Sequence, residues 1–295
     1  MIRAVETDAD IEAWLQVRRV VLPNESAGTV EQFRARRRPE QLALLAENDG
    51  VLAGSGLAGL SDAPGRGFVS PRVLPEARRQ GIGSALLERL LGHVATLRVD
   101  RVGAHVDDEG SRAFAERFGF EEIDRQVEQV WSGAVPAAEP PAGVEIATIA
   151  ERPELLEAAY PLAKAGWEDF ATAEAVTLSR EDFVREDATL PAGSFVALAD
   201  GEIVGFSGLC AGDFDGVAED GLTVVRRDWR RRGLARALKA LELEWAAAHG
   251  YREVVTWTQH GNDGMRALNE QLGYAYRSSS ITMSAELGRM PGSSS

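Results

Sequence analysis

One pattern occurs twice in this chain, and it constrains the fold more than any other feature. Residues 78–86 read RRQGIGSAL, and residues 230–238 read RRRGLARAL. Each copy stands between a strand-like run and a helix-like run. Small residues such as Gly81 and Gly233 let the backbone approach a ligand closely. A helix that begins at such a turn presents unpaired N–H groups and a partial positive charge, and both favour an anion such as a phosphate.

The helices predicted after the two turns, Ser84–Leu97 and Arg236–His249, each carry an apolar face that can pack on a sheet. A single turn of this kind is weak evidence, because an arginine-rich helix start reads the same way. Two copies in matched surroundings favour a phosphate-binding turn. Positive charge gathers around both turns from six arginines: Arg78, Arg79, Arg230, Arg231, Arg232 and Arg236.

The surroundings of the two turns also match. Upstream, Leu42–Leu57 and Phe195–Gly208 each read as two short strands joined by an acidic-glycine turn. Downstream, each half has a strand and a short helix that ends near Gly119 or Gly273, where a C-cap is expected. The copies are separated by about the length of a domain. The sequence therefore predicts a duplicated α/β domain, each copy a mixed sheet flanked by helices.

The residues of these motifs resemble the GCN5-related N-acetyltransferases (GNAT). The stretch VLPEARRQGIG at 73–83 is similar to the acetyl-CoA signature of that family, and VRRDWRRRGLA at 225–235 fits with Ala235 in place of the last glycine. NDGMRALNEQLGY at 262–274 is similar to the final helix and strand of the family. The resemblance covers nearly the whole chain, once per half, and implies two tandem GNAT (acyl-CoA N-acyltransferase) domains, as in mycothiol synthase-like actinobacterial acetyltransferases.

The expected domain boundaries follow the composition of the chain. The segment 132–142 is rich in Pro and Ala and lacks an apolar period, so we interpret it as an extended linker. It separates an N-terminal GNAT domain at 1–131, interpreted as degenerate or accessory, from a C-terminal one at 143–287, interpreted as catalytic. The small polar residues of 288–295 predict a flexible tail.

The resemblance implies acetyl-CoA as co-substrate, with its pantetheine arm paired like an extra strand along the central strand of the domain. In the C-terminal half it implies binding by Val224, Val225, Arg226, Arg230, Arg231, Arg232, Gly233, Leu234, Ala235, Arg236 and Asn262. In the N-terminal half it implies binding by Val73, Arg78, Arg79, Gln80, Gly81, Ile82, Gly83 and Ser84.

The chemistry needs an amine that has lost a proton, a thioester held nearby and stabilisation of the oxyanion that forms. Several family members carry a carboxylate at the start of the central strand that accepts the amine proton, and Asp220 and Glu219 stand there in the second copy. Phe68 and Gly67 match them in the first copy. The alternative is that both acids are solvated turn residues.

A second difference between the copies concerns the end of the coenzyme arm. Asn262 matches the family's asparagine there, whereas the first copy has Asp108, which would repel an anionic ligand. Many members also carry a tyrosine that protonates the leaving thiolate. That position holds Asn269 in the second half and Ala115 in the first. Asn269 cannot act as an acid, but its amide can donate a hydrogen bond to the sulfur or to the thioester oxygen. It is a catalytic candidate in that role alone.

Composition narrows the class of protein. The net charge of -14 argues against a nucleic-acid partner, which demands a basic surface. The one cysteine, Cys210, excludes an intrachain disulfide, and no apolar run approaches the ~20 residues of a membrane span. The four histidines lack the close pairing of a zinc site, so no metal is expected. The chain shows no charged-then-apolar leader, and we expect a cytoplasmic enzyme, monomer or homodimer.

Three hypotheses remain from the sequence. The first is a tandem N-acetyltransferase whose C-terminal half acetylates a primary amine of a small molecule by direct attack. The second places activity in the N-terminal half, whose turn is closer to the family signature. The third is a non-catalytic acyl-CoA-binding or scaffolding protein, which the missing tyrosine in both copies would allow. The identity of the acceptor amine does not follow from the sequence.

Overall fold

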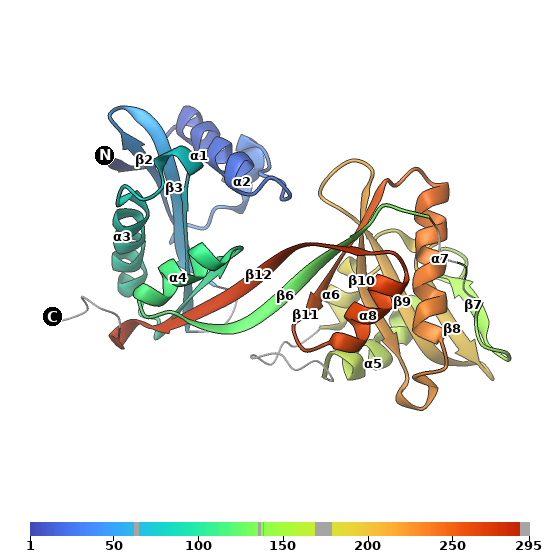
Figure 1. Ribbon diagram of the computed structural model, residues 1–295. Helices are drawn as coiled ribbons and strands as arrows, with labels where there is room; N and C mark the ends of the chain where they lie inside the picture. The colour runs from blue at the N-terminus through green and yellow to red at the C-terminus, as the bar shows by residue number, and fades with distance from the viewer. Residues whose placement is uncertain (62–64, 135–136, 138, 169–178, 290–295) are drawn as a thin grey trace. The chain divides into compact units, whose positions relative to one another are not determined.

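The computed structural model describes residues 1–61, 65–134, 137, 139–168 and 179–289. Its internal contacts divide the chain into two compact units (Figure 1). Unit 1 comprises Met1–Ile123 together with Ile281–Ser295, and unit 2 comprises Asp124–Ser280. Each unit holds a mixed set of neighbouring strands, with helices on both faces, as the duplication predicts.

Unit 1 places α3 on one face of its sheet and α1 with α2 on the other (Figure 1). Its strands lie in the order β1-β2-β3-β4-β5, followed by the last part of β12. In chain order its elements are β1 (Ile2–Ala4), α1 (Asp8–Val21), α2 (Val30–Arg36), β2 (Leu42–Asn48), β3 (Val51–Leu60), β4 (Arg66–Val73), a 3-10 turn (Pro75–Ala77), α3 (Ile82–Thr96), β5 (Arg101–Val106), α4 (Glu109–Arg117) and the start of β6 (Glu121–Trp131).

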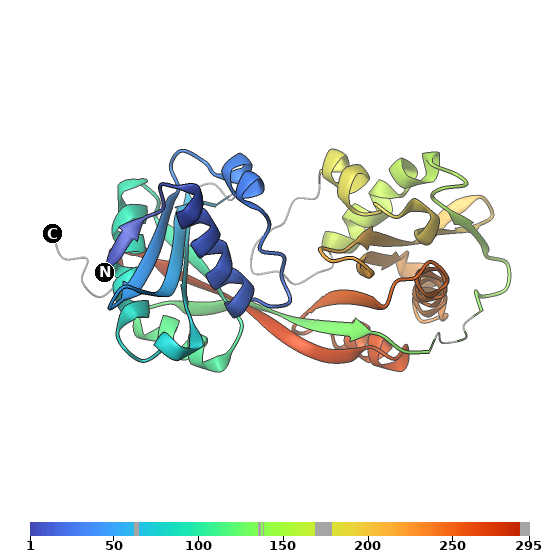
Figure 2. The same cartoon turned by 90° about the horizontal axis from the view of Figure 1, so that it is seen from above.

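Unit 2 repeats this plan, with α7 and α8 on one face of the sheet and α5 and α6 on the other (Figure 2). Its strands lie in the order β6-β11-β10-β9-β8-β7, and β10 runs parallel to β11 as β4 does to β5. Its elements are β7 (Glu145–Thr148), α5 (Glu154–Glu168), α6 (Arg180–Glu186), 3-10 turns (Pro191–Gly193 and Arg227–Trp229), β8 (Phe195–Ala199), β9 (Glu202–Ala211), β10 (Val217–Val225), α7 (Leu234–Ala248), β11 (Glu253–Gln259), α8 (Asp263–Gln271) and the start of β12 (Ala275–Glu286).

The two halves of the chain exchange their last strands. Strand β6 pairs with β11 inside unit 2, where Trp131 lies opposite Val254. Strand β12 ends in unit 1, where Ile281 lies opposite Val106 of β5. The expected domain ranges, 1–131 and 143–287, follow the chain in order and remain a prediction. Parts of the expected linker and most of the expected tail lie outside the described residues, while Leu287–Arg289 form a 3-10 turn.

The helices expected after the two turns are present, and each begins two residues earlier than the sequence suggests. Helix α3 buries the apolar face made by Leu86, Leu87, Leu90 and Val94. Because these side chains recur at helical spacing, one face of α3 covers the sheet while the other faces solvent. The packing of α3 and α7 on their sheets holds the turn before each helix in place.

Candidate functional site

The turn before α7 has the same backbone conformation as the turn before α3. Gly233 and Gly81 are both left-handed, with φ of 85° and 83°, and so are Arg231 and Arg79, with φ of 61° and 63°. Glycine adopts this conformation without strain, whereas an L side chain rarely does. No side chain of the described residues caps either helix at its glycine. The first N–H groups of α7 are therefore available to an external acceptor.

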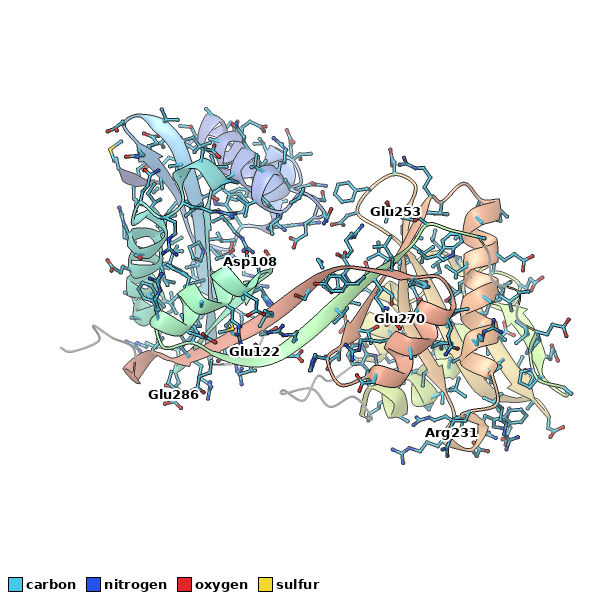
Figure 3. The ribbon with its side chains drawn as sticks, viewed as in Figure 1. Asp108, Glu122, Arg231, Glu253, Glu270 and Glu286 are labelled. Atoms are coloured by element: carbon cyan, nitrogen blue, oxygen red, sulfur yellow. The ribbon has the colours of Figure 1, made fainter. Side chains whose placement is uncertain are left out.

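Each turn is braced by its first arginine. Arg230 Nε donates to the carbonyl oxygen of Val225 at 3.0 Å, and Arg78 Nε donates to the carbonyl oxygen of Val73 at 3.3 Å. This hydrogen bond joins the end of the central strand to the turn, so the strand end and the helix start are fixed relative to each other in both units. Arg231 is exposed in the turn of unit 2, before the first residue of α7 (Figure 3).

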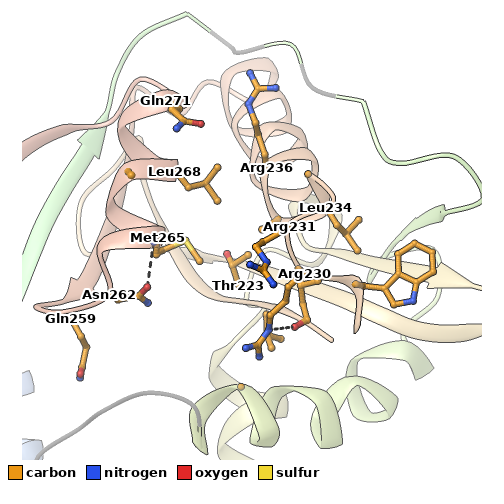
Figure 4. Close-up of a pocket in the computed structure, with 18 of the residues that line it drawn as sticks. Thr223, Arg230, Arg231, Leu234, Arg236, Gln259, Asn262, Met265, Leu268 and Gln271 are labelled. Atoms are coloured by element: carbon orange, nitrogen blue, oxygen red, sulfur yellow. Dashed lines mark hydrogen bonds between the residues drawn. The ribbon is translucent and has the colours of Figure 1, made fainter. Parts of the chain in front are cut away.

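Unit 2 contains a cavity of about 770 Å³ between the end of β10, the first turn of α7 and one side of α8 (Figure 4). Arg231 and Thr223 stand on one side of it, and Met265 and Leu268 on the other (Figure 4). The residues that line it are Gly166, Thr223, Val224, Val225, Trp229, Arg230, Arg231, Gly233, Leu234, Ala235, Arg236, Gln259, His260, Gly261, Asn262, Gly264, Met265, Ala267, Leu268 and Gln271.

Most of the coenzyme-binding candidates of the C-terminal half come together in this lining: Val224, Val225, Arg230, Arg231, Gly233, Leu234, Ala235, Arg236 and Asn262. Two candidates are engaged elsewhere. Arg226 forms ion pairs with Glu202 and Asp228 at 2.7 and 2.8 Å, and the guanidinium of Arg232 lies 4.8 Å from the ring centroid of Trp229.

The sequence did not identify the wall that α8 contributes. Met265 and Leu268 sit three residues apart, a spacing that equally describes an ordinary buried helix face. Asn262 caps this helix, because its Oδ1 accepts a hydrogen bond from the N–H of Met265 at 3.3 Å. The cap stabilises the first turn of α8, and the apolar side chains of Met265 and Leu268 line the cavity. The sequence signal for this wall is the strong amphipathicity of the short helix.

The central strand of unit 2 carries a β-bulge that the corresponding strand of unit 1 lacks. The pairing of β10 with β9 shifts register between Asp220 and Thr223, whereas β4 pairs with β3 without a shift from Gly67 to Val73. A bulge adds one unpaired residue and bends the strand, and such bulges are common beside active sites. Thr223 follows the bulge and lines the cavity, so the irregularity lies where the cavity meets the sheet.

Asp220 is buried behind the cavity wall. One of its carboxylate oxygens forms an ion pair with Lys239 Nζ and accepts a hydrogen bond from Tyr274 Oη at 3.0 Å. The other accepts from Thr223 Oγ1 at 3.4 Å. Thr223 is therefore the link between Asp220 and the cavity.

The other two catalytic candidates lie apart from this link. Glu219 is exposed on the opposite face of β10, and partial desolvation of its carboxyl, with Asp213 and Glu128 nearby, raises its pKa. Asn269 is completely buried, and its amide donates to Gln129 Oε1 at 3.0 Å and to Thr258 Oγ1 at 3.3 Å. Their catalytic roles stay predictions.

In unit 1 an aromatic side chain lies beside the turn. A Cβ on Gly83 would lie 3.6 Å from Cζ of Phe114, so this ring packs against the first turn of α3. Arg72, beside Val73, is partly buried and forms an ion pair with Asp107 at 3.6 Å.

The remaining candidates of unit 1 lie along its turn. Gln80 donates to the carbonyl oxygen of Glu76 at 3.2 Å and accepts from Asn48 at 2.8 Å. Arg78 and Arg79 are exposed, while Ile82, Gly83 and Ser84 are half-buried at the start of α3. The turn is thus preserved in unit 1, although the space beside it differs.

None of the helices among the described residues combines the length and apolar character that a membrane span requires. The described residues also hold no group of three or more His, Cys, Asp or Glu side chains placed to bind a metal ion.

Comparison with known proteins identifies the family. The model of the acetyltransferase (GNAT) family matches residues 9–120 and again 156–274. A mycothiol acetyltransferase of Actinosynnema mirum is 41% identical over 90 residues, which are 30% of this chain and 29% of that protein. Another, of Catenulispora acidiphila, is 28% identical over 225 residues, which are 71% of this chain and 69% of that protein.

Two solved structures share the fold over nearly the whole chain. A GCN5-related N-acetyltransferase from Sphaerobacter thermophilus has a TM-score of 0.76 at 20% identity, covering 99% of this chain and 96% of that one. A tandem GNAT protein from the clavulanic acid biosynthesis pathway has a TM-score of 0.70 at 21% identity, covering 98% of each chain. With one matching segment in each half, the chain belongs to the GNAT acetyltransferase family as a tandem member.

Proposed function

We propose that unit 2 binds acetyl-CoA in its cavity and transfers the acetyl group to a primary amine of a small molecule by direct attack. The observation that carries this proposal is the arrangement of the lining. A phosphate-binding turn with three arginines, Arg230, Arg231 and Arg236, stands at one end. The bulged end of β10, with Thr223, also lines the cavity.

The lining suits the parts of the coenzyme in order. The N–H groups of the first turn of α7 and the arginine side chains favour the pyrophosphate, since charge-assisted hydrogen bonds from arginine to phosphate are strong. Apolar side chains such as Val224, Met265 and Leu268 can contact the uncharged pantetheine arm. The thioester then comes to lie near the bulge of β10, where the reaction takes place.

Two differences between the units favour unit 2 as the active one. In unit 1 the Phe114 ring packs against Gly83 in the first turn of α3. In unit 2 the residue that matches Gly83 is Ala235, and it lines the cavity. Strand β4 runs without a bulge and places Pro71 opposite Gly56, where β10 places Thr223 opposite Ser207. Because proline has no N–H, the strand of unit 1 lacks a donor at that position.

The reaction itself asks little beyond positioning and proton transfer. Holding the amine and the thioester in contact can supply effective molarities of about 10⁵ M or more. The nitrogen must also lose a proton as it attacks the carbonyl carbon. Asp220 has a hydrogen-bonded route to the cavity through Thr223, and we assign it the role of proton acceptor ahead of Glu219. Asn269 then supports the wall by fixing α8 to β11.

Calorimetric titration of acetyl-CoA into the wild type and into Gly233→Glu and Gly81→Glu variants tests the location of the donor site. A glutamate at either turn places a carboxylate against the expected phosphate. We expect Gly233→Glu to abolish binding and Gly81→Glu to preserve it. Loss in Gly81→Glu alone would move the site to unit 1, and no binding by the wild type would refute the proposal.

Turnover is tested by thiol release from acetyl-CoA in the presence of a panel of amines. The panel includes the acceptor of mycothiol acetyltransferase, because two relatives carry that name. We expect amine-dependent release that Gly233→Glu abolishes. Tight binding of acetyl-CoA without release for any amine would favour the acyl-CoA-binding alternative.

A further inference from the structure

Unit 2 buries four ionisable side chains together beneath α7. Asp220, Lys239, Glu242 and Tyr274 are all at most 4% exposed. Lys239 is paired with Asp220 and lies 5.3 Å from the centroid of the Tyr274 ring. Neither carboxylate oxygen of Glu242 makes a hydrogen bond of good geometry among the described residues, and the Ser207 hydroxyl is the polar group that lies close enough to favour its charged form. Lysine and glutamate are almost never fully buried unless paired, so this cluster needs a reason.

Unit 1 shows that the fold does not require these charges. Counted from Gly233 and Gly81, the positions of Lys239 and Glu242 are held in α3 by Leu87 and Leu90. Both leucines are buried in the main core of unit 1. The same face of the same helix is thus apolar in the other copy.

The two remaining positions give the same result. Tyr274 follows Gly273 as Phe120 follows Gly119. Strand register equates Asp220 with Val69, because the bulge of β10 shifts the alignment by one residue from the Phe68 expected by counting along the sequence. Val69 and Phe120 are 1% and 3% exposed.

Stability does not explain the cluster in unit 2. Burying charges carries a desolvation penalty that their attraction barely offsets, and apolar side chains of similar size in their place are often neutral or stabilising. Unit 1 is the chain's own example of that apolar solution, with Val69, Leu87, Leu90 and Phe120 in one core. A function of unit 2 that unit 1 does not share is the simpler explanation.

The cluster reaches the cavity through hydroxyl groups. Thr223 lines the cavity and donates to Asp220 at 3.4 Å, and its Oγ1 lies 2.9 Å from Ser207 Oγ. In unit 1 these two hydroxyl-bearing positions are taken by Pro71 and Gly56, which have no hydroxyl group. The polar route and the buried charges therefore occur together in unit 2 and are absent together from the matching positions of unit 1.

Burial brings the proton affinities of the cluster toward each other. It lowers the pKa of Lys239 and raises the pKa of Glu242, because each charged form loses its hydration. It also raises the pKa of Tyr274, which stays protonated. Among the described residues, these three and Asp220 are the buried titratable groups of the cluster, and they come from β10, α7 and the residue before β12. Lys239 and Glu242 interact and titrate as a pair, so this pair can gain or lose a proton close to neutral pH.

We propose that this cluster holds the proton that moves during acetyl transfer, and that the hydroxyl of Thr223 carries it in both directions. This inference rests on the function proposed for unit 2. The amine nitrogen attacks the thioester carbonyl carbon as its proton passes to Thr223 Oγ1, while the hydroxyl's own proton passes to Asp220. The carbon–sulfur bond then breaks and sulfur leaves with the electron pair. The held proton returns through Thr223 to sulfur, giving amide and thiol.

One relay would then serve both proton transfers of the reaction. This accounts for the absence of a tyrosine at Asn269, since the sulfur would receive its proton from the cluster. Thr223 is the group that touches the reacting atoms. Asp220, Lys239, Glu242 and Tyr274 act through it and set how readily it accepts and returns the proton.

The sharpest test replaces the cluster by its counterpart from unit 1. The variant combines Asp220→Val, Lys239→Leu, Glu242→Leu and Tyr274→Phe, residues that pack well in the same fold. We expect it to fold and to bind acetyl-CoA with a Kd within about threefold of wild type. We expect kcat to fall about 100-fold or more, the usual range for lost acid–base catalysis. A folded variant with kcat within about fivefold of wild type would overturn the proposal.

Two further comparisons decide the matter even if the fourfold variant fails to fold. Thr223→Val should lower kcat about 100-fold, while Thr223→Ser, which keeps the hydroxyl, should stay within about fivefold. Glu242→Gln should shift or remove the acid limb of the kcat–pH profile. If Thr223→Val and Thr223→Ser have equal kcat values and Glu242→Gln leaves the acid limb where it was, the relay is refuted and the proposed function still stands. A wild type without acetyl-CoA turnover would refute the proposed function with it.

Discussion

The buried pair of Lys239 and Asp220 makes a strong prediction for stability. Lys239→Leu removes the cation and leaves the Asp220 carboxylate in the core with hydrogen bonds from Tyr274 and Thr223 alone. Breaking one side of a buried ion pair costs about 3–5 kcal/mol, because an uncompensated charge remains. Adding Asp220→Val should recover most of that loss, since the matching positions in unit 1 are Val69 and Leu87. We expect the double variant to remain about 1–2 kcal/mol less stable than wild type, because Glu242 loses its neighbouring cation and Tyr274 Oη loses its acceptor.

Hydrogen exchange of the amides of α7 reads this effect in unit 2 itself. Exchange from a packed helix reports the free energy of the opening that exposes it. Since 1.36 kcal/mol is tenfold in an equilibrium constant, Lys239→Leu should lower protection roughly 10²- to 10⁴-fold. Asp220→Val with Lys239→Leu should restore it to within about 30-fold of wild type. If the two substitutions have additive costs, the pair is not energetically coupled and the reasoning fails.

Three further predictions follow from local geometry. Gly208→Ala should destabilise unit 2 by about 3 kcal/mol or more, because the added Cβ would lie 1.8 Å from the Asp187 carbonyl oxygen. Gly92→Ala should stabilise the protein by about 0.5–1 kcal/mol, because the added Cβ meets open space within α3. Urea unfolding measures both changes. Burial raises the pKa of Asp187 to about 6, so the folded state holds this proton more tightly than the unfolded state does. The free energy of unfolding should therefore fall as pH rises from about 4 to about 6, and Asp187→Asn should flatten that slope. An unchanged slope would contradict the assignment. Arg231→Ala should weaken acetyl-CoA binding about tenfold or more, because Arg231 lines the cavity. Arg226→Ala should weaken it less than about threefold, because Arg226 is paired with Glu202 and Asp228. Equal losses of affinity in the two variants would contradict this.

The repeated turn was predictable because local chemistry determines it. Gly81 and Gly233 must be left-handed for the chain to enter the helix, and the arginines around them are contiguous in sequence. Asn262 was expected only to meet the coenzyme arm, and its capping of α8 is seen in the structure. The mixed α/β fold and the family followed from these local signals and their repetition.

What sequence reasoning missed depends on contacts between distant segments. Helical spacing places Leu234, Leu238, Leu241 and Trp245 on the apolar face of α7, and all four pack in the core of unit 2. The structure adds Lys239 and Glu242 to the buried side chains of this helix, which no apolar pattern indicates. The bulge between Asp220 and Thr223 is likewise invisible without the partner strand, because the register of β9 reveals it. The exchange of β6 and β12 pairs residues far apart in the chain, which no local pattern specifies.

The most direct test of the central claim is hydrogen exchange of the wild-type protein with and without acetyl-CoA. If unit 2 holds the donor, protection should appear in the turn and first residues of α7, at 230–236, and at the start of α8 near Asn262. The equivalent amides of unit 1, at 78–84, should be unchanged. Protection confined to 78–84 would contradict the account, because the coenzyme would then occupy the unit whose core lacks the buried cluster.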